Sequence, residues 1–262
     1  MTDTTGVWMY AVTDEPLADR EAEAASGVAG ERTRTVHEGG LTAVVGTVPL
    51  DGFGEAALAR NLEDLDWLER IARAHDSVVA DLSLQVPVVP LRLATVCLDD
   101  ERVRELLTEH GEQFSSALAL VRGRTEWGVK AFADRKELTQ ASAESRTEES
   151  GSGSGTAYLL RRRAQLAAQE NVERDAAARA DDIHDRLLRK AAAGRRGAPT
   201  DPALSGSHEW MLLNGTYLVD DDRAGEFRAE VDELGARFPG IRLEMSGPWP
   251  PYSFAGAERI SP

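Results

Sequence analysis

The sequence predicts a two-domain α+β protein: an N-terminal ferredoxin-like α/β sandwich, a long middle helix and a C-terminal β-α-β domain. Three observations lead to this fold class. Strand and helix patterns first follow the order β-β-β-α-β-α-β, a run rich in Ala, Arg and Leu without Gly or Pro comes next, and a strand–helix–strand pattern follows it. The predicted boundaries are 1–135 for the N-terminal domain, 136–156 for a linker, 157–193 for the long helix, 194–206 for a second linker and 207–262 for the C-terminal domain packed with the long helix.

The N-terminal domain begins with three predicted strands and a helix. Residues 6–13 are short, apolar and rich in aromatic and β-branched side chains, which predicts a buried strand. Residues 33–50 form two strand patterns around Gly39-Gly40, a dipeptide that can supply the positive φ angles of a tight hairpin. In residues 54–84 apolar side chains recur every three or four positions, as in a helix packed on a sheet.

Another strand, a helix and a further strand complete this domain. Residues 85–98 predict a second buried strand, whose prolines indicate an irregular start or a sheet edge. Residues 99–123 predict a helix with acidic residues at its positive N-terminal end. The segment 125–134 predicts the last strand.

Two Ser- and Gly-rich breaks flank the long helix, and their composition is typical of flexible linkers. The helix carries only a narrow apolar stripe, so we expect one packed seam and a charged outer surface. After it come a strand at 209–220, a helix at 221–239 and a strand at 240–254. These three elements are too small to bury a core alone, so they need the long helix or the first domain as a cover.

Charge and composition exclude several classes of protein. The formal net charge is −15, whereas nucleic-acid and anionic-lipid binders need a surplus of Lys and Arg. A single cysteine, Cys97, permits no intrachain disulfide and no four-cysteine metal site. No apolar run reaches the ~18 residues that cross a bilayer, and the N-terminus lacks a signal-peptide pattern. We therefore expect a cytoplasmic protein that binds no nucleic acid and does not insert in membranes.

Catalytic signatures are missing from the sequence. It has no Gly-x-Ser-x-Gly, no His-Glu-x-x-His, no Walker A loop and no Cys-x-x-Cys. The glycines at 151–155 follow no strand and lack the lysine of a phosphate loop, so they indicate a linker. The acidic run 181–185 places only half a metal site on one helix face. We expect no catalytic, cofactor-binding or metal-binding residue, and hence no cofactor.

Three isolated side chains are best interpreted as structural. His75 falls on the apolar side of its helix, and Arg92 lies in an otherwise apolar strand. A buried histidine or arginine needs partners, and we expect each to be a satisfied structural group rather than a catalyst. Cys97 has no evident base beside it and is interpreted as a small core residue.

Five stretches, in the same order along the chain, resemble the gas vesicle protein F/L family. They are the segment 75–103 with its Pro-Leu-Arg, "EWGVKAF", "GTAYLLRRR", "LNGTYLVD" and "GPWPPYSF". Leu93 and Ala94 replace the usual Phe and Gly, which bears on any detail that needs a flexible glycine there. The candidate structural or signature residues are His75, Pro90, Arg92, Trp127, Gly128, Lys130, Tyr158, Arg161, Gly247, Pro248, Trp249, Pro250, Tyr252 and Phe254.

The resemblance implies a function that composition alone does not show. Proteins similar to this chain are non-enzymatic accessory components of gas vesicle assembly, with two α/β domains joined through helices. The resemblance implies that it binds the hydrophobic shell protein, other gas vesicle accessory proteins, or both, as a nucleator or chaperone-like adaptor associated with gas vesicles.

Two alternatives remain open at this point. One is a small-molecule-binding sensor or enzyme that uses ferredoxin-like domains, in which ligands often bind at domain interfaces. The other is a structural oligomer driven by the long helix.

The proline-rich string near the C-terminus follows a strand pattern, so we interpret Trp249, Tyr252 and Phe254 as anchors that fasten the last strand, rather than as an exposed binding peptide.

Overall fold

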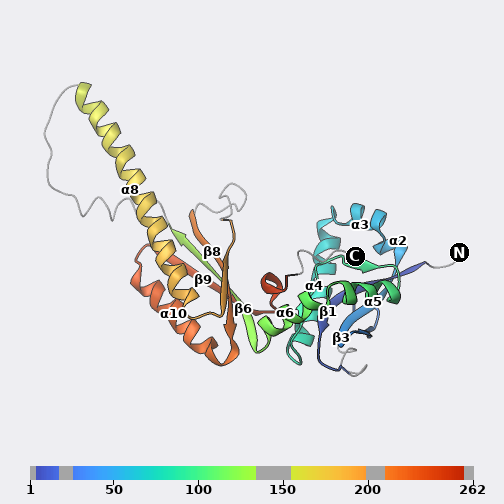
Figure 1. Cartoon of the computed structure of the whole chain (residues 1–262). Helices are drawn as coiled ribbons and strands as arrows, with labels where there is room; N and C mark the ends of the chain where they lie inside the picture. Colours follow the sequence, from blue (N-terminus) through green and yellow to red (C-terminus); the bar gives the residue numbers. More distant parts are fainter. Residues whose placement is uncertain (1–3, 18–25, 134–154, 199–209, 257–262) are drawn as a thin grey trace. The chain divides into compact units, whose positions relative to one another are not determined.

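The computed structural model describes residues 4–17, 26–133, 155–198 and 210–256, and for 155–169 it describes the backbone only. The chain forms two compact units, shown in Figure 1. Unit 1 comprises residues 1–126 together with 248–262, and unit 2 comprises residues 127–247. Each unit is built on one β-sheet, and each is described by itself below.

The sheet of unit 1 contains five strands. Its order is β2-β3-β1-β4, with β5 also paired to β1. The predicted hairpin between β2 and β3 is confirmed: Gly39 and Gly40 have φ angles of 57° and 80°, as a turn with two positive φ values requires. The strands are β1 (Thr5–Thr13), β2 (Thr33–Glu38), β3 (Leu41–Pro49), β4 (Val89–Pro90) and β5 (Val96–Cys97).

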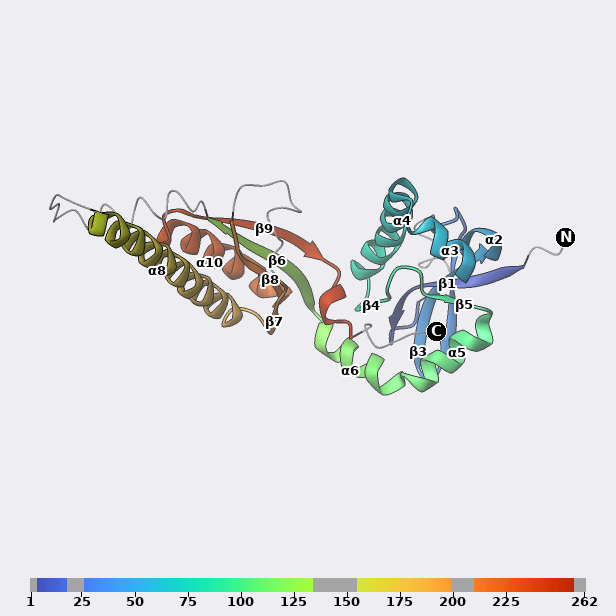
Figure 2. The same cartoon turned by 90° about the horizontal axis from the view of Figure 1, so that it is seen from above.

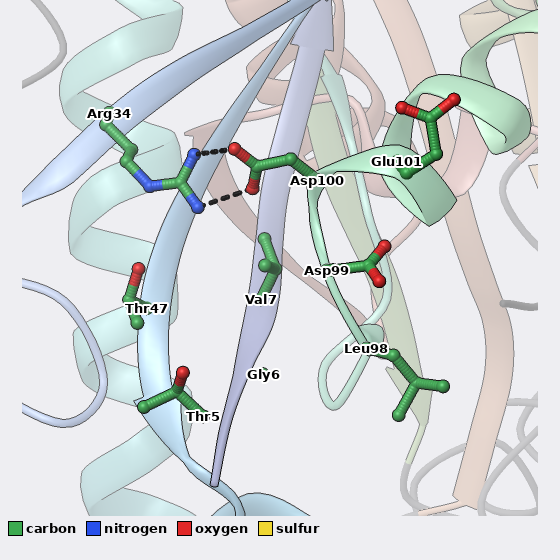
Figure 3. Close-up of a pocket in the computed structure, with 9 residues that line it drawn as sticks. All are labelled: Thr5, Gly6, Val7, Arg34, Thr47, Leu98, Asp99, Asp100 and Glu101. Carbon is green, nitrogen blue, oxygen red and sulfur yellow. Dashed lines mark hydrogen bonds and ion pairs between the residues drawn. The ribbon is translucent and has the colours of Figure 1, made fainter. Parts of the chain in front are cut away.

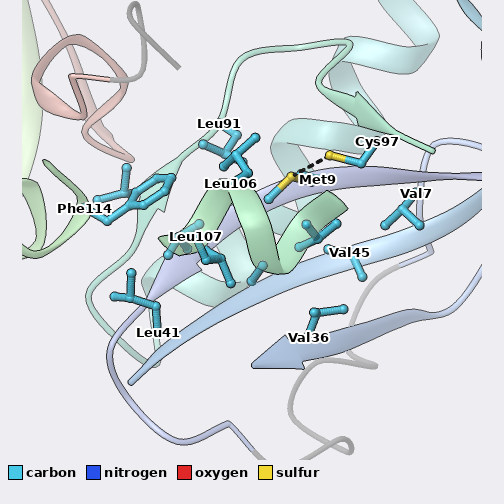
Figure 4. Packing of buried hydrophobic residues seen from close by; sticks show 14 of the residues in the cluster. Val7, Met9, Val36, Leu41, Val45, Leu91, Cys97, Leu106, Leu107 and Phe114 are labelled. Atoms are coloured by element: carbon cyan, nitrogen blue, oxygen red, sulfur yellow. Dashed lines mark hydrogen bonds between the residues drawn. The ribbon is translucent and has the colours of Figure 1, made fainter. Parts of the chain in front are cut away.

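Helices cover both faces of this sheet (Figure 2). The cluster on one face includes Trp8 and Tyr10 from β1, and the cluster on the other includes Met9 and Phe114 (Figure 4). Because both faces are covered, β1 is buried at every position from its second residue to its last. The helices are α2 (Leu50–Phe53), α3 (Glu55–Asn61) and α4 (Leu65–Ser83) on the Trp8 face, and α5 (Asp100–Glu109) and α6 (Gly111–Val121) on the Met9 face.

Two predicted helices are each interrupted. The expected helix 54–84 stops after α3, and Asp64 starts α4 by accepting hydrogen bonds from the backbone N–H groups of Asp66 and Trp67. The expected helix 99–123 breaks at His110, which ends α5 and precedes α6. Apolar spacing marks the packed face of a helix but continues across such a local break.

The predicted strand 85–98 is wrong in its middle. Between β4 and β5 the chain turns outward, and the backbone N–H and side-chain hydroxyl of Thr95 donate to the carbonyl of Arg92 at 3.2 and 2.8 Å. Ala94 occupies the third position of this turn with φ +66°. The turn directs Arg92 to solvent, so the expectation of a buried arginine is also wrong.

Unit 2 has the β-α-β-β-α-β connectivity of a ferredoxin-like fold, with strand order β7-β8-β6-β9. Unit 1 has the corresponding strand order, without a helix between β1 and β2 among the residues described there. The α+β fold class is thus confirmed. The elements are β6 (Arg124–Ala133), α8 (Gly155–Leu188), β7 (Ala193–Arg196), β8 (Trp210–Asp220), α10 (Ala224–Arg237) and β9 (Ile241–Trp249), with short 3-10 turns at Asp221–Arg223 and Tyr252–Phe254.

The units do not follow the predicted boundaries. Strand β6, expected in the first domain, is a central strand of the unit 2 sheet. Strand β7 lies partly in the expected linker 194–206, and residues 248–256 belong to unit 1 rather than to the C-terminal domain. Strand alternation in a sequence shows that a segment pairs, but not which sheet it joins.

Helices α8 and α10 pack on one face of the unit 2 sheet. One cluster holds Ile183 and Leu187 of α8 together with Phe227 of α10 and Trp127 of β6. Burial alternates along β9, as in a strand with one covered face. The long helix therefore has the single packed seam that the sequence predicts.

Candidate functional site

An apolar groove opens at one end of the unit 1 sheet. It encloses about 600 Å³ between α2–α3 on one side and the segment from Ala94 to Leu98 on the other. Glu55 and Arg102 supply its charged groups. This groove, called the apolar groove below, is lined by Leu50, Phe53, Gly54, Glu55, Leu58, Ala94, Val96, Cys97, Leu98 and Arg102.

A second cavity of about 500 Å³ adjoins the groove at Leu98. It contains the carboxylates of Asp99, Asp100 and Glu101 and one cation, Arg34, whose guanidinium donates to both oxygens of Asp100 at 2.9 and 2.6 Å (Figure 3). We call it the acidic cavity. Its other lining residues are Thr5, Gly6, Val7, Thr47 and Leu98.

Leu98 stands between the two cavities. It is 74% exposed, although it directly follows the buried Cys97 at the end of β5. Its exposed apolar surface adjoins the apolar groove, and apolar surface that continues into a groove is typical of a site that a partner covers.

Strand β5 has a free edge beside the groove. The backbone N–H of Met9 donates to the carbonyl of Thr95 at 2.9 Å, and Val96 lies opposite Trp8 in the antiparallel register. Opposed residues alternate between hydrogen-bonded and non-hydrogen-bonded pairs, so Val96 directs its own N–H and C=O away from β1. Among the strands that the structure describes, none pairs with this edge.

His75 is held inside unit 1 by two hydrogen bonds. The indole N–H of Trp8 donates to Nδ1 at 3.0 Å, and Nε2 lies 3.2 Å from the carbonyl oxygen of Leu91. An indole can only donate, so Nδ1 accepts and Nε2 carries the proton. Burial lowers the pKa of His75 to about 4. The ring is thus a neutral structural link between α4, β1 and the segment after β4.

The C-terminal signature string packs on unit 1. Ser253 donates its backbone N–H and hydroxyl to the two carboxylate oxygens of Glu126 at 2.8 and 2.7 Å. The hydroxyl of Tyr252 donates to Asp76 at 2.7 Å, and Phe254 is buried. We call residues 250–256 the strap. It brings Tyr252 next to the helix that carries His75.

Trp249 differs from the other aromatic residues of the string. It is 53% exposed, so its predicted role as an anchor is wrong, whereas Tyr252 and Phe254 do pack. Gly247 lies within β9 with a φ of 119°, a conformation that suits glycine. Pro248 is exposed and Pro250 half-buried.

The remaining signature residues do not gather in one place. Pro90 is buried in β4. In unit 2, Trp127 is buried, and the guanidinium of Arg228 lies 4.6 Å from the centre of its ring. Gly128 has no room for a side chain, because a Cβ there would lie 2.7 Å from the Ser246 hydroxyl. Lys130 is exposed. Tyr158 and Arg161 lie in the first turns of α8, and their side chains are outside the part of the chain that the structure describes.

Cys97 and the acidic run show no reactive arrangement. Burial raises the pKa of the Cys97 thiol to about 11, and its sulfur lies 3.6 Å from that of Met9. Asp181 pairs with Arg196 at 2.7 Å, and Nδ1 of His184 lies 2.8 Å from the Tyr217 hydroxyl. Within the described ranges, no three His, Cys, Asp or Glu side chains group closely enough to hold a metal ion.

The sequence does not predict the groove. It forms only when α2–α3 and β5, which are more than thirty residues apart in the chain, meet at the sheet end. One local signal was available: Leu98 is an apolar residue set directly before three consecutive carboxylates, at the end of a strand pattern.

Comparison with known proteins identifies the class. The model of the family described as gas vesicle synthesis protein GvpL/GvpF matches residues 6–256. The chain is 43% identical over 249 residues to gas vesicle protein L of Streptomyces sp. (strain CB03234), covering 95% of this chain and 92% of that protein. It is 29% identical to gas vesicle protein F of the same strain, over 84% of this chain and 87% of that protein.

A solved structure agrees on the fold. The crystal structure of GvpF from Anabaena sp. PCC7120 superposes with a TM-score of 0.72 at 18% identity and covers 96% of each chain. The fold and the sequence matches together define an accessory protein of the gas vesicle. The chain belongs to the GvpL/GvpF family. Membership supports a role in gas vesicle formation, and the family is not a known family of enzymes.

No helix within the described residues is long and apolar enough to cross a membrane.

Proposed function

We propose that this chain binds the apolar shell protein of the gas vesicle and holds it in solution as a nucleator or chaperone-like adaptor, alone or with other accessory proteins. The observation that carries the proposal is the apolar groove with its exposed rim at Leu98, on a chain of net charge −15. A subunit that is apolar on one face aggregates when released alone. A strongly acidic binder would cover that face and keep the complex dispersed.

The rival sensor or enzyme function has less support. A small-molecule site combines an apolar pocket with several convergent polar groups. The apolar groove is lined by one carboxylate and one guanidinium, and Arg102 already pairs with Glu105 and Glu109 at 3.1 and 3.2 Å. We therefore favour a protein segment over a small molecule as its occupant.

Co-expression tests the proposal. The full chain is produced with a tagged shell protein, and the soluble and sedimented fractions are compared with those of shell protein alone. We expect the chain to co-purify with the tag and to move shell protein into the supernatant. If the chain bound neither the shell protein nor any other accessory protein encoded in the same gas vesicle gene cluster, the proposed function would be refuted.

A further inference from the structure

We propose that two copies of this chain pair through the outer edge of β9, antiparallel about Leu243, and so join their unit 2 sheets into one continuous sheet. Strand β9 lies at the end of the order β7-β8-β6-β9. Its inner edge pairs with β6, and no described strand pairs with its outer edge. The dimer involves unit 2 alone, so it goes beyond the proposed function and does not depend on it.

The outer edge of β9 lacks the features that usually keep an edge strand unpaired. Natural edge strands are short, or they carry proline, lysine or repelling charges. Strand β9 spans nine residues, and the stretch from Ile241 to Ser246 contains neither proline nor lysine. The opposite edge of the described sheet is protected, because β7 is only four residues long and ends in Arg195 and Arg196. Of these two edges, β9 is therefore the one suited to pairing.

The side chains of β9 divide between the two faces of the sheet. Ile241, Leu243 and Met245 pack in the cluster that α8 and α10 cover. Arg242 and Glu244 lie on the other face, where they form an ion pair with 48% and 52% of their side chains exposed. The strand thus offers an apolar row on one face and two opposite charges on the other.

Charge selects one register for two such strands. In an antiparallel pair with a two-fold axis perpendicular to the sheet, residues directly opposite each other lie on the same face. With Leu243 on the axis, Arg242 lies opposite the partner's Glu244, and Glu244 lies opposite the partner's Arg242. A shift that places either charged residue on the axis sets two like charges opposite each other, which is destabilising.

The backbone at the ends of the strand favours the same register. Gly240 and Gly247 have φ angles of 82° and 119°, and they bound the stretch from Ile241 to Ser246. A pair centred on Leu243 aligns residues 241–245 of both copies, which lie inside this stretch. A pair centred on Met245 would instead include Gly247 and Pro248, and proline has no N–H to donate.

The apolar row of β9 is also complementary to itself in this register. Leu243 lies opposite its own copy, and Met245 lies opposite the partner's Ile241. Because Leu243 and Met245 are only half-buried in the single chain, the second copy would cover part of their remaining surface. One pair of strands is a small interface, so we expect dissociation in the micromolar range.

Charge reversals in β9 test the dimer by sedimentation velocity of the full chain. Wild type should shift from one chain to two as its concentration rises through the micromolar range. Arg242→Glu and Glu244→Arg should each raise the dissociation constant at least about tenfold, because each sets like charges opposite each other at two positions. The controls are Arg73→Glu and Glu69→Arg, which make the same changes in an exposed ion pair on α4 and should have no effect.

The two β9 variants also rescue each other if the register is right. Mixed in equal amounts, Arg242→Glu and Glu244→Arg should form a heterodimer about as tight as the wild-type dimer, because every charge then lies opposite one of the other sign. Hydrogen exchange of β9 should slow with rising concentration in wild type and in the mixture, but not in either variant alone.

Three results would overturn the dimer. They are a wild-type chain that stays single at every concentration, equal effects of Arg242→Glu and Arg73→Glu, and a mixture of the two β9 variants that does not associate. Self-association that both β9 variants leave unchanged would assign it to another surface, such as the long helix α8. If Arg242→Glu is a single chain and still co-purifies with shell protein, the proposed function stands without the dimer.

Discussion

The two units share a strand order but differ in how their sheets are covered. In unit 1, β1 is buried on both faces, against α4 on one and α5–α6 on the other. In unit 2, α8 and α10 share one face, and β9 alternates between buried and exposed positions. The same order of strands thus supports a three-layer unit and a two-layer unit. The difference shows in the sequence as a continuous apolar run against an alternating one.

The largest effect should come from truncating side chains on both faces of β1. Trp8→Ala and Met9→Ala should each cost about 3–4 kcal/mol of unfolding free energy, because each leaves a cavity in a different packed layer. In β6 only the buried residue should matter. Trp127→Ala should lower the unfolding free energy by about the same 3–4 kcal/mol, whereas Lys130→Ala should change it by less than about 0.5 kcal/mol. Urea unfolding measures all four. A negligible effect of Met9→Ala would remove the distinction between the units.

The strap provides the next test, because it assigns the C-terminal residues to unit 1. Phe254→Ala should cost about 3 kcal/mol, whereas the equally aromatic but exposed Trp249 should tolerate alanine within about 1 kcal/mol. Hydrogen exchange should show faster exchange in β1 and α6 for Phe254→Ala, with β8 unchanged. Faster exchange confined to β8 would place the strap in unit 2.

Acidification should weaken unit 1 through His75. Its folded pKa of about 4 lies below the unfolded value of about 6.5, so the unfolded chain binds the proton more tightly. The stability contributed by neutral His75 is complete above pH 6.5 and is lost as the pH falls towards 4, by about 2–3 kcal/mol. His75→Gln can keep both hydrogen bonds without titrating there.

Urea unfolding of wild type and His75→Gln at pH 7 and pH 4.5 measures the difference, since other titrating groups are common to both. The difference in unfolding free energy between wild type and His75→Gln should be smaller at pH 4.5 than at pH 7, by the stability that wild type loses when His75 takes up a proton on unfolding. Parallel pH profiles would show that His75 does not control the acid sensitivity.

The smallest expected effect is a gain. Ala94 has φ +66°, a conformation that costs an alanine more than a glycine, so Ala94→Gly should stabilise unit 1 by about 0.5–1 kcal/mol. The control is Ala72→Gly in α4, where glycine should destabilise by about 1 kcal/mol. Thermal unfolding of both variants and of wild type measures these changes in stability. A loss of stability for Ala94→Gly would mean that its methyl group contributes more by packing in the groove than the backbone strain costs.

Local patterns predicted most elements of this fold. The apolar spacing of α4, the Gly39-Gly40 turn and the Ala-rich long helix are properties of neighbouring residues, so the sequence shows them directly. The unit to which β6 belongs, in contrast, is not a property of neighbouring residues. It depends on pairing with β8 and β9, which lie far along the chain, and strand periodicity does not encode the partner.

The candidate site was the least predictable part. His75 could be identified as structural because a lone imidazole on an apolar face needs partners. Only the structure shows that those partners are Trp8 and Leu91. Arg92 was misplaced because a single residue with positive φ, Ala94, turns the chain outward within an apolar run. The groove is assembled from α2–α3 and β5, so no contiguous motif marks it.

The strap has a consequence for how the protein is made. Unit 1 is discontinuous: residues 127–247 separate its first segment from the strap that Glu126 holds. During translation all of unit 2 leaves the ribosome before Ser253 and Phe254 do, and domains generally fold as they emerge. The unit that begins first is therefore completed last, and a nascent chain stalled within unit 2 would carry an unfinished unit 1 surface open to chaperones.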